Sequence, residues 1–348
     1  MEEFTKTAFQ EKKQKWVNLY EEVPLDMPLS LNIELSGDCN YKCLFCSRSI
    51  AKYPIKRANH MSEETYLKIM RDLASSGEVQ MLYLNGGGES LLNPDFSTLI
   101  RSFSLQKVSR QTLMSTNASL LNEKNSKALI ESGLDYLRIS ISSIFQQTHE
   151  KLTQSKTHVN EIYENIRSFR AMRDKMNSKT PFLFIKMFDT FSEENELFKQ
   201  RYGHLADKIE IDKLDNWNGE SNFVKSAYNI REESIQEKAN IDFGEREIRK
   251  TKICPHPFYK SQIRWNGDVS VCPADIITDN IMGNVHSESF HDIWNGKVFN
   301  RLRLEFLKGG HKSYTSCTNC RAYLLDISEG NLDSLTPSEY MSRLGKKK

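Results

Sequence analysis

Apolar residues group along the chain in two ways, as short uninterrupted runs and as longer stretches with a helical period. The short runs are bounded by polar or glycine residues and lie at 31–35, 79–85, 112–117, 134–142, 182–187 and 208–214. The longer stretches place their apolar residues on one helical face and lie at 62–77, 94–105, 122–132, 159–176 and from Ser192 onward. The pattern therefore predicts six strands that alternate with helices.

Several sequence signals predict where helices begin and end. Ser62 is followed by two glutamates and suits a helix N-cap, and Gly77 follows the last apolar position of that helix. Pro94 is expected at the first position of the next helix. A separate amphipathic helix is expected over 6–22, near the start of the chain.

Mostly apolar strands separated by helices indicate a parallel sheet that helices cover. An open doubly wound sheet and a barrel both fit this order, and the six units suit an α/β fold with a partial (β/α)6 barrel of the TIM type. Either architecture places its chemistry at the C-terminal ends of the strands. Polar segments follow the first three strands at 36–49, at 85–90 and at Asn117, so we expect them at one edge.

The pattern changes after the sixth predicted strand. A two-residue hairpin is expected at Asn266-Gly267, where short alternating runs flank a strong turn signal. A helix over 289–310 is expected to break or bend near Gly296. We divide the chain into an N-terminal helical extension, a barrel, a polar linker, a small C-terminal domain and a tail, at 1–29, 30–215, 216–253, 254–325 and 326–348.

Composition places the 348-residue chain among ordinary globular proteins, with 38% hydrophobic residues, 27% charged residues and a formal net charge of +2. The near-neutral balance gives no reason to expect a nucleic-acid or membrane partner. No run reaches the roughly 18 apolar residues of a membrane-spanning helix. The charged start has no apolar core of a signal peptide, so we expect a cytoplasmic protein.

The cysteines carry the candidate chemistry. There are seven, and their odd number and tight clustering argue against a disulfide framework. Clustered thiols in a cytosolic protein indicate metal or redox chemistry instead. The first group is Cys39, Cys43 and Cys46, and the second group is Cys254, Cys272, Cys317 and Cys320.

The first group has the spacing C-x3-C-x2-C on one loop. A structural zinc site normally closes its shell with four ligands, and a distant His or Cys would have to complete it here. Three cysteines can instead hold three irons of a [4Fe-4S] cluster and leave the fourth iron open to a molecule that is not protein. Both interpretations fit three thiols, and the second explains why there is no fourth.

This loop, with Phe45 just before the third cysteine, resembles that of the radical S-adenosylmethionine (radical SAM) enzymes. The resemblance implies a partial barrel of six strands and a [4Fe-4S] cluster on Cys39, Cys43 and Cys46. It also implies that the open iron binds the amino and carboxylate groups of SAM. Reduction of the cluster would then cleave SAM to methionine and a 5′-deoxyadenosyl radical, which abstracts a substrate hydrogen.

Three further segments resemble SAM-binding motifs of the same family. The segment 85–90 is similar to its GGE motif, which implies that Gly86, Gly87, Gly88 and the Glu89 carboxylate bind the SAM ammonium group. The segment 115–117 resembles the family's element after the third strand, which implies SAM contacts from Ser115 and Asn117. The segment 138–143 resembles the family's fourth strand, which implies that Ser140 contacts the SAM ribose.

The chain departs from the family pattern at several of these positions. Ala118 replaces a glycine after Asn117, and Ser142 and Ser143 stand where many relatives carry Asp and Gly. The arginine often found in the following helix is absent, so the partner of the SAM carboxylate is open. Lys186, on the fifth predicted strand, either points into the barrel or faces solvent.

The second group of four thiols can make a closed site for zinc or for an iron-sulfur cluster. Its spacing, together with Gly267 and the segment 283–295, resembles the SPASM/twitch extension of radical SAM enzymes. The later cysteines of full SPASM domains are missing, so the resemblance implies the shorter twitch form with one auxiliary [4Fe-4S] cluster. The spacing is similar to that of the butirosin-pathway dehydrogenase, which oxidises an aminocyclitol alcohol.

The resemblance implies oxidation of an alcohol to a ketone on a small carbohydrate-like or aminocyclitol-like substrate. The auxiliary cluster would accept the electron, and a flavodoxin-type protein would reduce the first cluster. A base is needed, and nothing in the sequence selects one among His149 and the Tyr and Lys candidates. An epimerase with a cysteine hydrogen donor is less favoured, because all seven cysteines are assigned as ligands.

Two alternatives stay open at this point. One is a radical SAM enzyme that modifies a peptide or protein. The lack of further cluster cysteines and of an obvious peptide-recognition domain counts against it. The other is a non-catalytic scaffold that binds an iron-sulfur cluster or zinc. The intact GGGES segment (86–90) counts against this, since a scaffold has no need for a SAM site.

Overall fold

The computed structural model describes residues 18–46, 48, 59–212, 251–275, 280–318, 320, 322–325 and 331–346. The expected helix over 6–22 lies mostly outside these residues, and its described end is helix α1, Leu19–Glu22. The expected linker also lies outside them, apart from residues 251–253.

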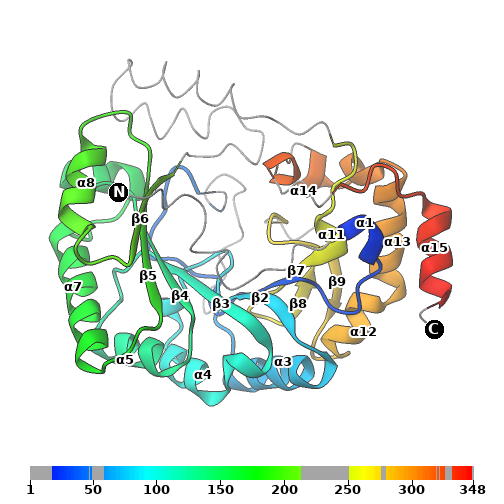
Figure 1. Cartoon of the computed structure of the whole chain (residues 1–348), viewed down its shortest axis with the longest axis horizontal. Helices are drawn as coiled ribbons and strands as arrows, with labels where there is room; N and C mark the ends of the chain where they lie inside the picture. The colour runs from blue at the N-terminus through cyan, green and yellow to red at the C-terminus, as the bar shows by residue number, and fades with distance from the viewer. Residues whose placement is uncertain are drawn as a thin grey trace.

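All six predicted strands are present, and they pair side by side in parallel. They are β1 (Ser30–Ile33), β2 (Val79–Tyr83), β3 (Ser109–Thr116), β4 (Tyr136–Ile141), β5 (Phe182–Phe188) and β6 (Lys208–Asp212). They follow one another in sequence order across the sheet. The sheet curves, with helices on its convex side (Figure 1). Those helices are α3 (Glu63–Ser76), α4 (Phe96–Ser102), α5 (Glu123–Glu131), α7 (Val159–Lys175) and α8 (Glu194–Tyr202) (Figure 1). Helix α6 (Gln146–Thr153) lies between β4 and α7 in the sequence, and the cysteine loop bonds to its last residues.

The predicted helix start at Ser62 is confirmed, whereas the one at Pro94 is wrong. The Ser62 side chain accepts a hydrogen bond from the Thr65 backbone N–H, which caps α3. Helix α4 begins only at Phe96, after a short 3-10 turn at Ser90–Leu92. The reason is Asn93, whose side-chain amide donates to the carbonyls of Leu35 and Met61 and holds this segment outside the helix.

Three more strands extend the sheet beyond the predicted barrel. They are β7 (Lys260–Ile263), β8 (Asp268–Ser270) and β9 (Ile281–Asn284). Strand β7 pairs in parallel with β1, and β8 and β9 add antiparallel, so the described strands form one nine-stranded sheet. The residues predicted as barrel and as small C-terminal domain therefore share a continuous sheet.

The predicted hairpin is present, but its turn is longer than expected. The Gly267 N–H donates to the Arg264 carbonyl at 2.9 Å, so the turn spans 264–267 and not Asn266-Gly267 alone. Gly267 has a positive φ of 84°, the conformation that glycine adopts without strain. This longer turn carries Arg264 and Trp265 out to the edge where β1 ends.

The rest of the C-terminal region packs around this hairpin. The helix predicted over 289–310 is broken at Gly296 into α12 (Phe290–Asn295) and α13 (Lys297–Leu307). The shorter elements of this region are α11 (His256–Tyr259), η3 (Gly310–Ser313), α14 (Thr315–Thr318) and η4 (Ala322–Leu325). One further short turn, η2 (Leu105–Lys107), precedes β3. The predicted tail contains a further helix, α15 (Pro337–Lys346), whose buried Tyr340 hydroxyl donates to Asn300 Oδ1 at 2.9 Å.

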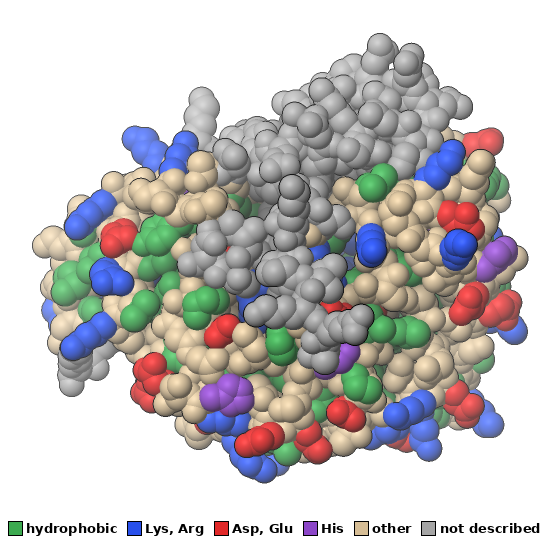
Figure 2. Space-filling model, turned by 180° about the vertical axis from the view of Figure 1, so that it is seen from behind, with side chains coloured by type: hydrophobic (Ala, Val, Ile, Leu, Met, Phe, Trp, Pro, Cys, Tyr) green, Lys and Arg blue, Asp and Glu red, His purple; other side chains and the backbone are tan. Residues whose placement is uncertain are grey.

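The surface of the described residues mixes charges of both signs. Figure 2 shows basic and acidic side chains interspersed over the face opposite to that of Figure 1. No helix among the described residues is both long enough and apolar enough to cross a membrane.

Candidate functional site

The three polar segments predicted to share one edge do so, and they bond to each other. The Asn117 side chain donates to Asn40 Oδ1 at 3.0 Å, which ties the end of β3 to the first cysteine loop. The Glu89 backbone N–H donates to the Asp38 carbonyl at 2.8 Å, which ties the segment after β2 to the same loop. The loop after β1 is therefore held from two neighbouring strands.

Glu89 is the buried centre of this network. Its Oε1 accepts from the Thr116 hydroxyl at 2.9 Å and from the Leu91 N–H at 3.2 Å, while its Oε2 accepts from the Asn117 N–H at 2.9 Å. Burial raises the pKa of the Glu89 carboxyl, although these donors oppose the shift. The carboxylate thus joins two motifs of the protein, and its expected contact with the SAM ammonium group stays a prediction.

Replacement of this carboxylate by an amide tests its structural role. In Glu89→Gln, the new NH2 group must face an N–H or O–H donor, which leaves a buried donor without its acceptor. We expect the free energy of unfolding to fall by about 1–3 kcal/mol. Urea unfolding of the metal-free protein measures this, with Glu123→Gln on an exposed helix start as control, expected within about 0.5 kcal/mol of wild type. Equal stability of the two variants would contradict the role of Glu89.

The glycines of this segment serve the protein's own packing. A Cβ atom on Gly86 would lie 2.5 Å from the Glu34 side chain, and one on Gly88 would collide with the Ser36 and Asp38 carbonyls. The Gly87 N–H donates to Glu34 Oε1 at 2.5 Å. In the structure, these glycines therefore allow a close approach to the segment that follows β1. Ligand binding by these three glycines stays a prediction.

The cysteine loop is hydrogen-bonded to the end of helix α6. Lys42 and Leu44 donate their backbone N–H groups to carbonyls at the end of α6, at 2.8 and 2.9 Å. The Cys39 Sγ accepts from the Tyr41 N–H at 3.4 Å, and burial raises the pKa of this thiol to about 11. Burial also raises the pKa of Cys43, and the neighbouring Cys39 and Cys46 thiols add to the shift. Cys39 and Cys43 thus resist ionisation in the free protein, and the iron of a bound cluster would stabilise them as thiolates.

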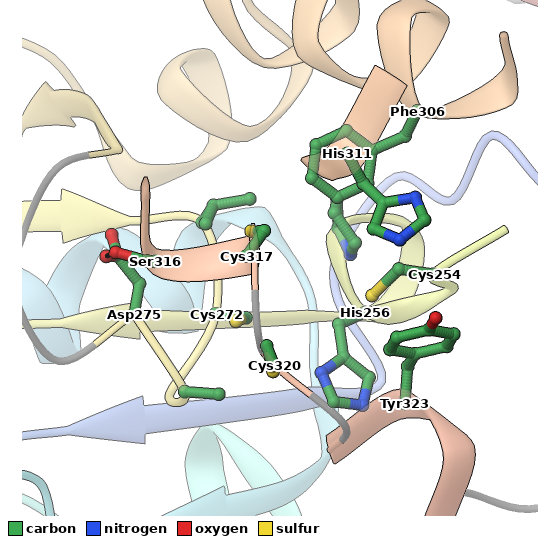
Figure 3. Close-up of a pocket in the computed structure, with 13 residues that line it drawn as sticks. Cys254, His256, Cys272, Asp275, Phe306, His311, Ser316, Cys317, Cys320 and Tyr323 are labelled. Carbon is green, nitrogen blue, oxygen red and sulfur yellow. Dashed lines mark hydrogen bonds between the residues drawn. The ribbon is translucent and has the colours of Figure 1, made fainter. Parts of the chain in front are cut away.

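The four remaining cysteines line one cavity of the C-terminal region, as Figure 3 shows. Cys254 and Cys272 are buried, and burial together with the neighbouring thiols raises their pKa values. Each thiol of Cys254, Cys272 and Cys320 accepts a hydrogen bond from the backbone N–H two residues later, as Cys39 does. Four thiols that line one cavity, three of them with a backbone donor, fit a cluster with complete protein ligation.

Two further observations test which group this cavity suits. His311 lines it and is buried, and neither of its ring nitrogens has a hydrogen-bond partner among the described residues. A sulfide-bearing cluster would offer acceptors to such a ring. Within the described part of the chain, no three His, Cys, Asp or Glu side chains are close enough to hold one metal ion. The His311 ring, unpartnered as far as the chain is described, is the observation that fits a sulfide-bearing cluster in this cavity.

Family comparisons agree with this geometry. Residues 33–185 match the model of the radical SAM superfamily, and residues 254–321 match that of SPASM, an iron-sulfur cluster-binding domain. The chain thus contains a radical SAM domain and a SPASM domain. Its cofactors are SAM, a [4Fe-4S] cluster that binds SAM, and auxiliary iron-sulfur cluster content in the SPASM domain. The assignment of the named cysteines as the ligands stays a prediction.

Individual relatives share the architecture at low identity. The tungsten-containing aldehyde ferredoxin oxidoreductase cofactor-modifying protein of Pyrococcus furiosus is 22% identical over 320 residues, covering 83% of this chain and 86% of the relative. Streptococcus suis SuiB bound to its precursor peptide SuiA is 18% identical with a TM-score of 0.60, covering 92% and 76%. BtrN in complex with AdoMet and 2-DOIA is 17% identical with a TM-score of 0.52, covering 84% and 93%. The similarity to an aminocyclitol dehydrogenase is therefore only distant.

The concave face of the radical SAM domain is polar near the cysteine loop. Ser115, Arg138, Ser140 and Lys186 lie on this face, in register on β3, β4 and β5. The Arg138 Nε donates to Ser115 Oγ at 3.0 Å, and burial lowers the pKa of this guanidinium. Lys186 Nζ lies 2.8 Å from Asp212 Oδ2 at the end of β6. Lys186 is therefore paired with an acid, and the SAM contacts of Ser115 and Ser140 stay predictions.

An apolar layer lies on the same face nearer the N-terminal ends of the strands. It consists of Met81, Leu113 and Tyr136, with Tyr83 and Phe182 packed against them. The sequence analysis did not identify Arg138 and Asp212 as polar residues of this face. The signal that could have found them is the alternation of charged with apolar residues inside β4 and β6.

Phe45 and His149 lie against the cysteine loop. Phe45 packs edge to face on Phe188 at the end of β5, with the ring centroids 5.3 Å apart. The His149 ring packs in the same way on Tyr41, at 5.6 Å, and is 1% exposed. Burial lowers the pKa of His149, so the ring is neutral at pH 7. His149 supports the loop from behind, which gives no reason to prefer it as the base.

Proposed function

We propose that this protein oxidises an alcohol group of a polar, carbohydrate-like small molecule to a ketone, with SAM as the source of the hydrogen-abstracting radical. One electron from the reduced SAM-binding cluster would cleave SAM to methionine and the 5′-deoxyadenosyl radical, which would take one hydrogen atom from the carbinol carbon and become 5′-deoxyadenosine. A base would take the hydroxyl proton, and the remaining electron would pass to the auxiliary cluster. The substrate thereby loses two hydrogens, and the electron used to cleave SAM is matched by the one released from the substrate.

The observation that supports this proposal is the charged layer on the concave face. Arg138, Lys186 and Asp212 lie on the same face of the neighbouring strands β4, β5 and β6, beyond an apolar layer, and Lys186 pairs with Asp212. Such a lining suits a compact molecule with several hydroxyl or amino groups. The auxiliary cysteines flank the hairpin whose first strand pairs with β1, so both cysteine sites belong to one sheet.

The solved structures similar to this chain include BtrN with 2-DOIA and SuiB with its precursor peptide SuiA, so the substrate class needs a direct test. The anaerobically reconstituted, reduced protein is incubated with SAM and either the filtered small-molecule extract or the macromolecular fraction of the source cells. We expect the small-molecule fraction to stimulate formation of 5′-deoxyadenosine. Mass spectrometry should then find a product that lacks two hydrogens.

Two outcomes would overturn parts of the proposal. Stimulation by the macromolecular fraction alone would replace the carbohydrate-like substrate by a peptide or protein. Absence of SAM cleavage under strong reduction, with both clusters present by iron analysis, would exclude radical SAM catalysis and favour a binding scaffold.

A further inference from the structure

The turn between β7 and β8, residues 264–267, crosses from the SPASM domain to the cofactor edge of the radical SAM domain. The Trp265 backbone N–H points at Glu34 Oε2, with 3.4 Å between nitrogen and oxygen. The Trp265 ring fills the space beside Gly37, where a Cβ atom would lie 2.7 Å from the ring. The SPASM turn thus packs against the segment that precedes Cys39 and donates a hydrogen bond to it.

Glu34 lies directly beneath the glycine segment after β2. Its side chain is fully buried, and its Oε1 accepts the Gly87 N–H at 2.5 Å. Burial raises the pKa of this carboxyl, and the nearby Arg264 guanidinium is the strongest opposing influence. The Gly87 N–H is therefore held by a buried acid whose main counter-charge, Arg264, comes from the SPASM domain, with a smaller contribution from Arg48.

Arg264 bridges from this acid to the auxiliary cysteines. Its Nη1 lies 3.9 Å from Glu34 Oε1, and its Nη2 donates to the Asp275 carbonyl. Arg264 is 3% exposed and Asp275 is 1% exposed. The Asp275 carboxylate accepts from the Ser316 hydroxyl at 2.5 Å, and Ser316 directly precedes Cys317 (Figure 3). The Asp275 N–H donates to the carbonyl of Cys272 at 3.1 Å.

We propose that Arg264 is a positioning residue that couples the auxiliary-cluster site to the SAM site through Glu34 and Gly87. A guanidinium is planar and has several donors, so it can contact an acid and a carbonyl at once in a fixed geometry. Removal of one member of a buried charged pair leaves the other without its counter-charge and displaces what it holds. The inference rests on SAM binding at this edge and does not depend on the alcohol-oxidation proposal.

The test compares SAM binding by reconstituted variants in the absence of any substrate. We expect Arg264→Met to raise the Kd for SAM by roughly tenfold or more, within the 5–150-fold range typical of coupled sites. Arg264→Lys keeps the positive charge and should restore part of the affinity. Arg303→Met is the matched control, because Arg303 is equally buried in the SPASM domain but donates to Pro257, Trp294 and Asn300. Its SAM affinity is expected to stay within twofold of wild type.

A second readout needs neither cluster nor SAM. Hydrogen exchange of the peptide containing residues 84–91 should quicken in metal-free Arg264→Met but not in metal-free Arg303→Met. Only the former deprives Glu34, the acceptor of the Gly87 N–H, of the Arg264 charge that holds it in place. The double variant E34Q/R264M removes both charges and leaves neither unpaired. We expect it to bind SAM more tightly than Arg264→Met alone, which a purely local packing defect would not produce.

Glu34→Gln serves if Arg264→Met does not fold, because glutamine has the same shape and can still accept from Gly87. It leaves Arg264 without its acid and should also weaken SAM binding several-fold. Wild-type-like SAM affinity, within twofold, in whichever of the two variants carries full iron would overturn the coupling. Additive effects in the double variant would overturn it as well. Failure of the alcohol-oxidation proposal would leave these binding results unchanged.

Discussion

Cys43→Ala is expected to abolish formation of 5′-deoxyadenosine, reducing it to the background of the no-enzyme reaction. With the predicted ligand set, the SAM-binding cluster would need all three thiolates of the first group, and the loop has no further cysteine to take the place of Cys43. Reverse-phase chromatography of reactions with SAM and dithionite measures the nucleoside. Iron analysis and electron paramagnetic resonance should show the loss of one cluster and the retention of the other.

Retention of the auxiliary cluster is the internal control for folding of this variant. A Cys43→Ala protein that keeps both clusters and still cleaves SAM would remove Cys43 from the ligand set. It would also contradict the assignment of C-x3-C-x2-C as the SAM-binding site.

The double variant C254A/C320A is expected to separate SAM cleavage from substrate oxidation. It removes two of the four cysteines that line the C-terminal cavity and leaves Cys272, next to the Asp275 contact, in place. Without an electron acceptor beside the substrate, 5′-deoxyadenosine should still form while the oxidised product falls to background. The measurement is the ratio of product to 5′-deoxyadenosine, each quantified by mass spectrometry.

The same double variant also distinguishes a redox role from a structural one. If its product ratio equals that of wild type, the auxiliary cluster holds the fold together and does not accept the electron. If SAM cleavage is lost as well, while iron analysis shows the first cluster intact, the two sites depend on each other more strongly than electron transfer requires.

Much of the fold follows from local pattern. The six strands of the barrel and their helices were predictable because each strand is a short apolar run and each helix repeats with its own period. The common edge of the cysteine loop, Glu89 and Asn117 followed from the parallel order alone. The break at Gly296 was predictable for a similar reason, since one glycine interrupts an otherwise continuous helical pattern.

The parts that were not predictable depend on contacts between distant residues. The pairing of β7 with β1 joins segments more than 200 positions apart, and no local signal specifies it. The turn spans 264–267 because the Gly267 N–H donates a hydrogen bond to the Arg264 carbonyl. The strong Asn-Gly signal favoured a shorter turn at the sequence level. The late start of α4 depends on Asn93 reaching the carbonyls of Leu35 and Met61. Likewise, only the folded chain brings Arg264 to Glu34.

The parallel pairing of β1 with β7 has a consequence for synthesis on the ribosome. Ile33 is made 227 residues before Lys260, so one edge of β1 stays open until the strand that covers it has been translated. At about 5–20 residues per second, this interval lasts roughly 10–45 seconds. An uncovered apolar strand edge can pair with other chains. The yield of native protein in a heterologous host should therefore depend on translation speed and on chaperones that shield nascent chains.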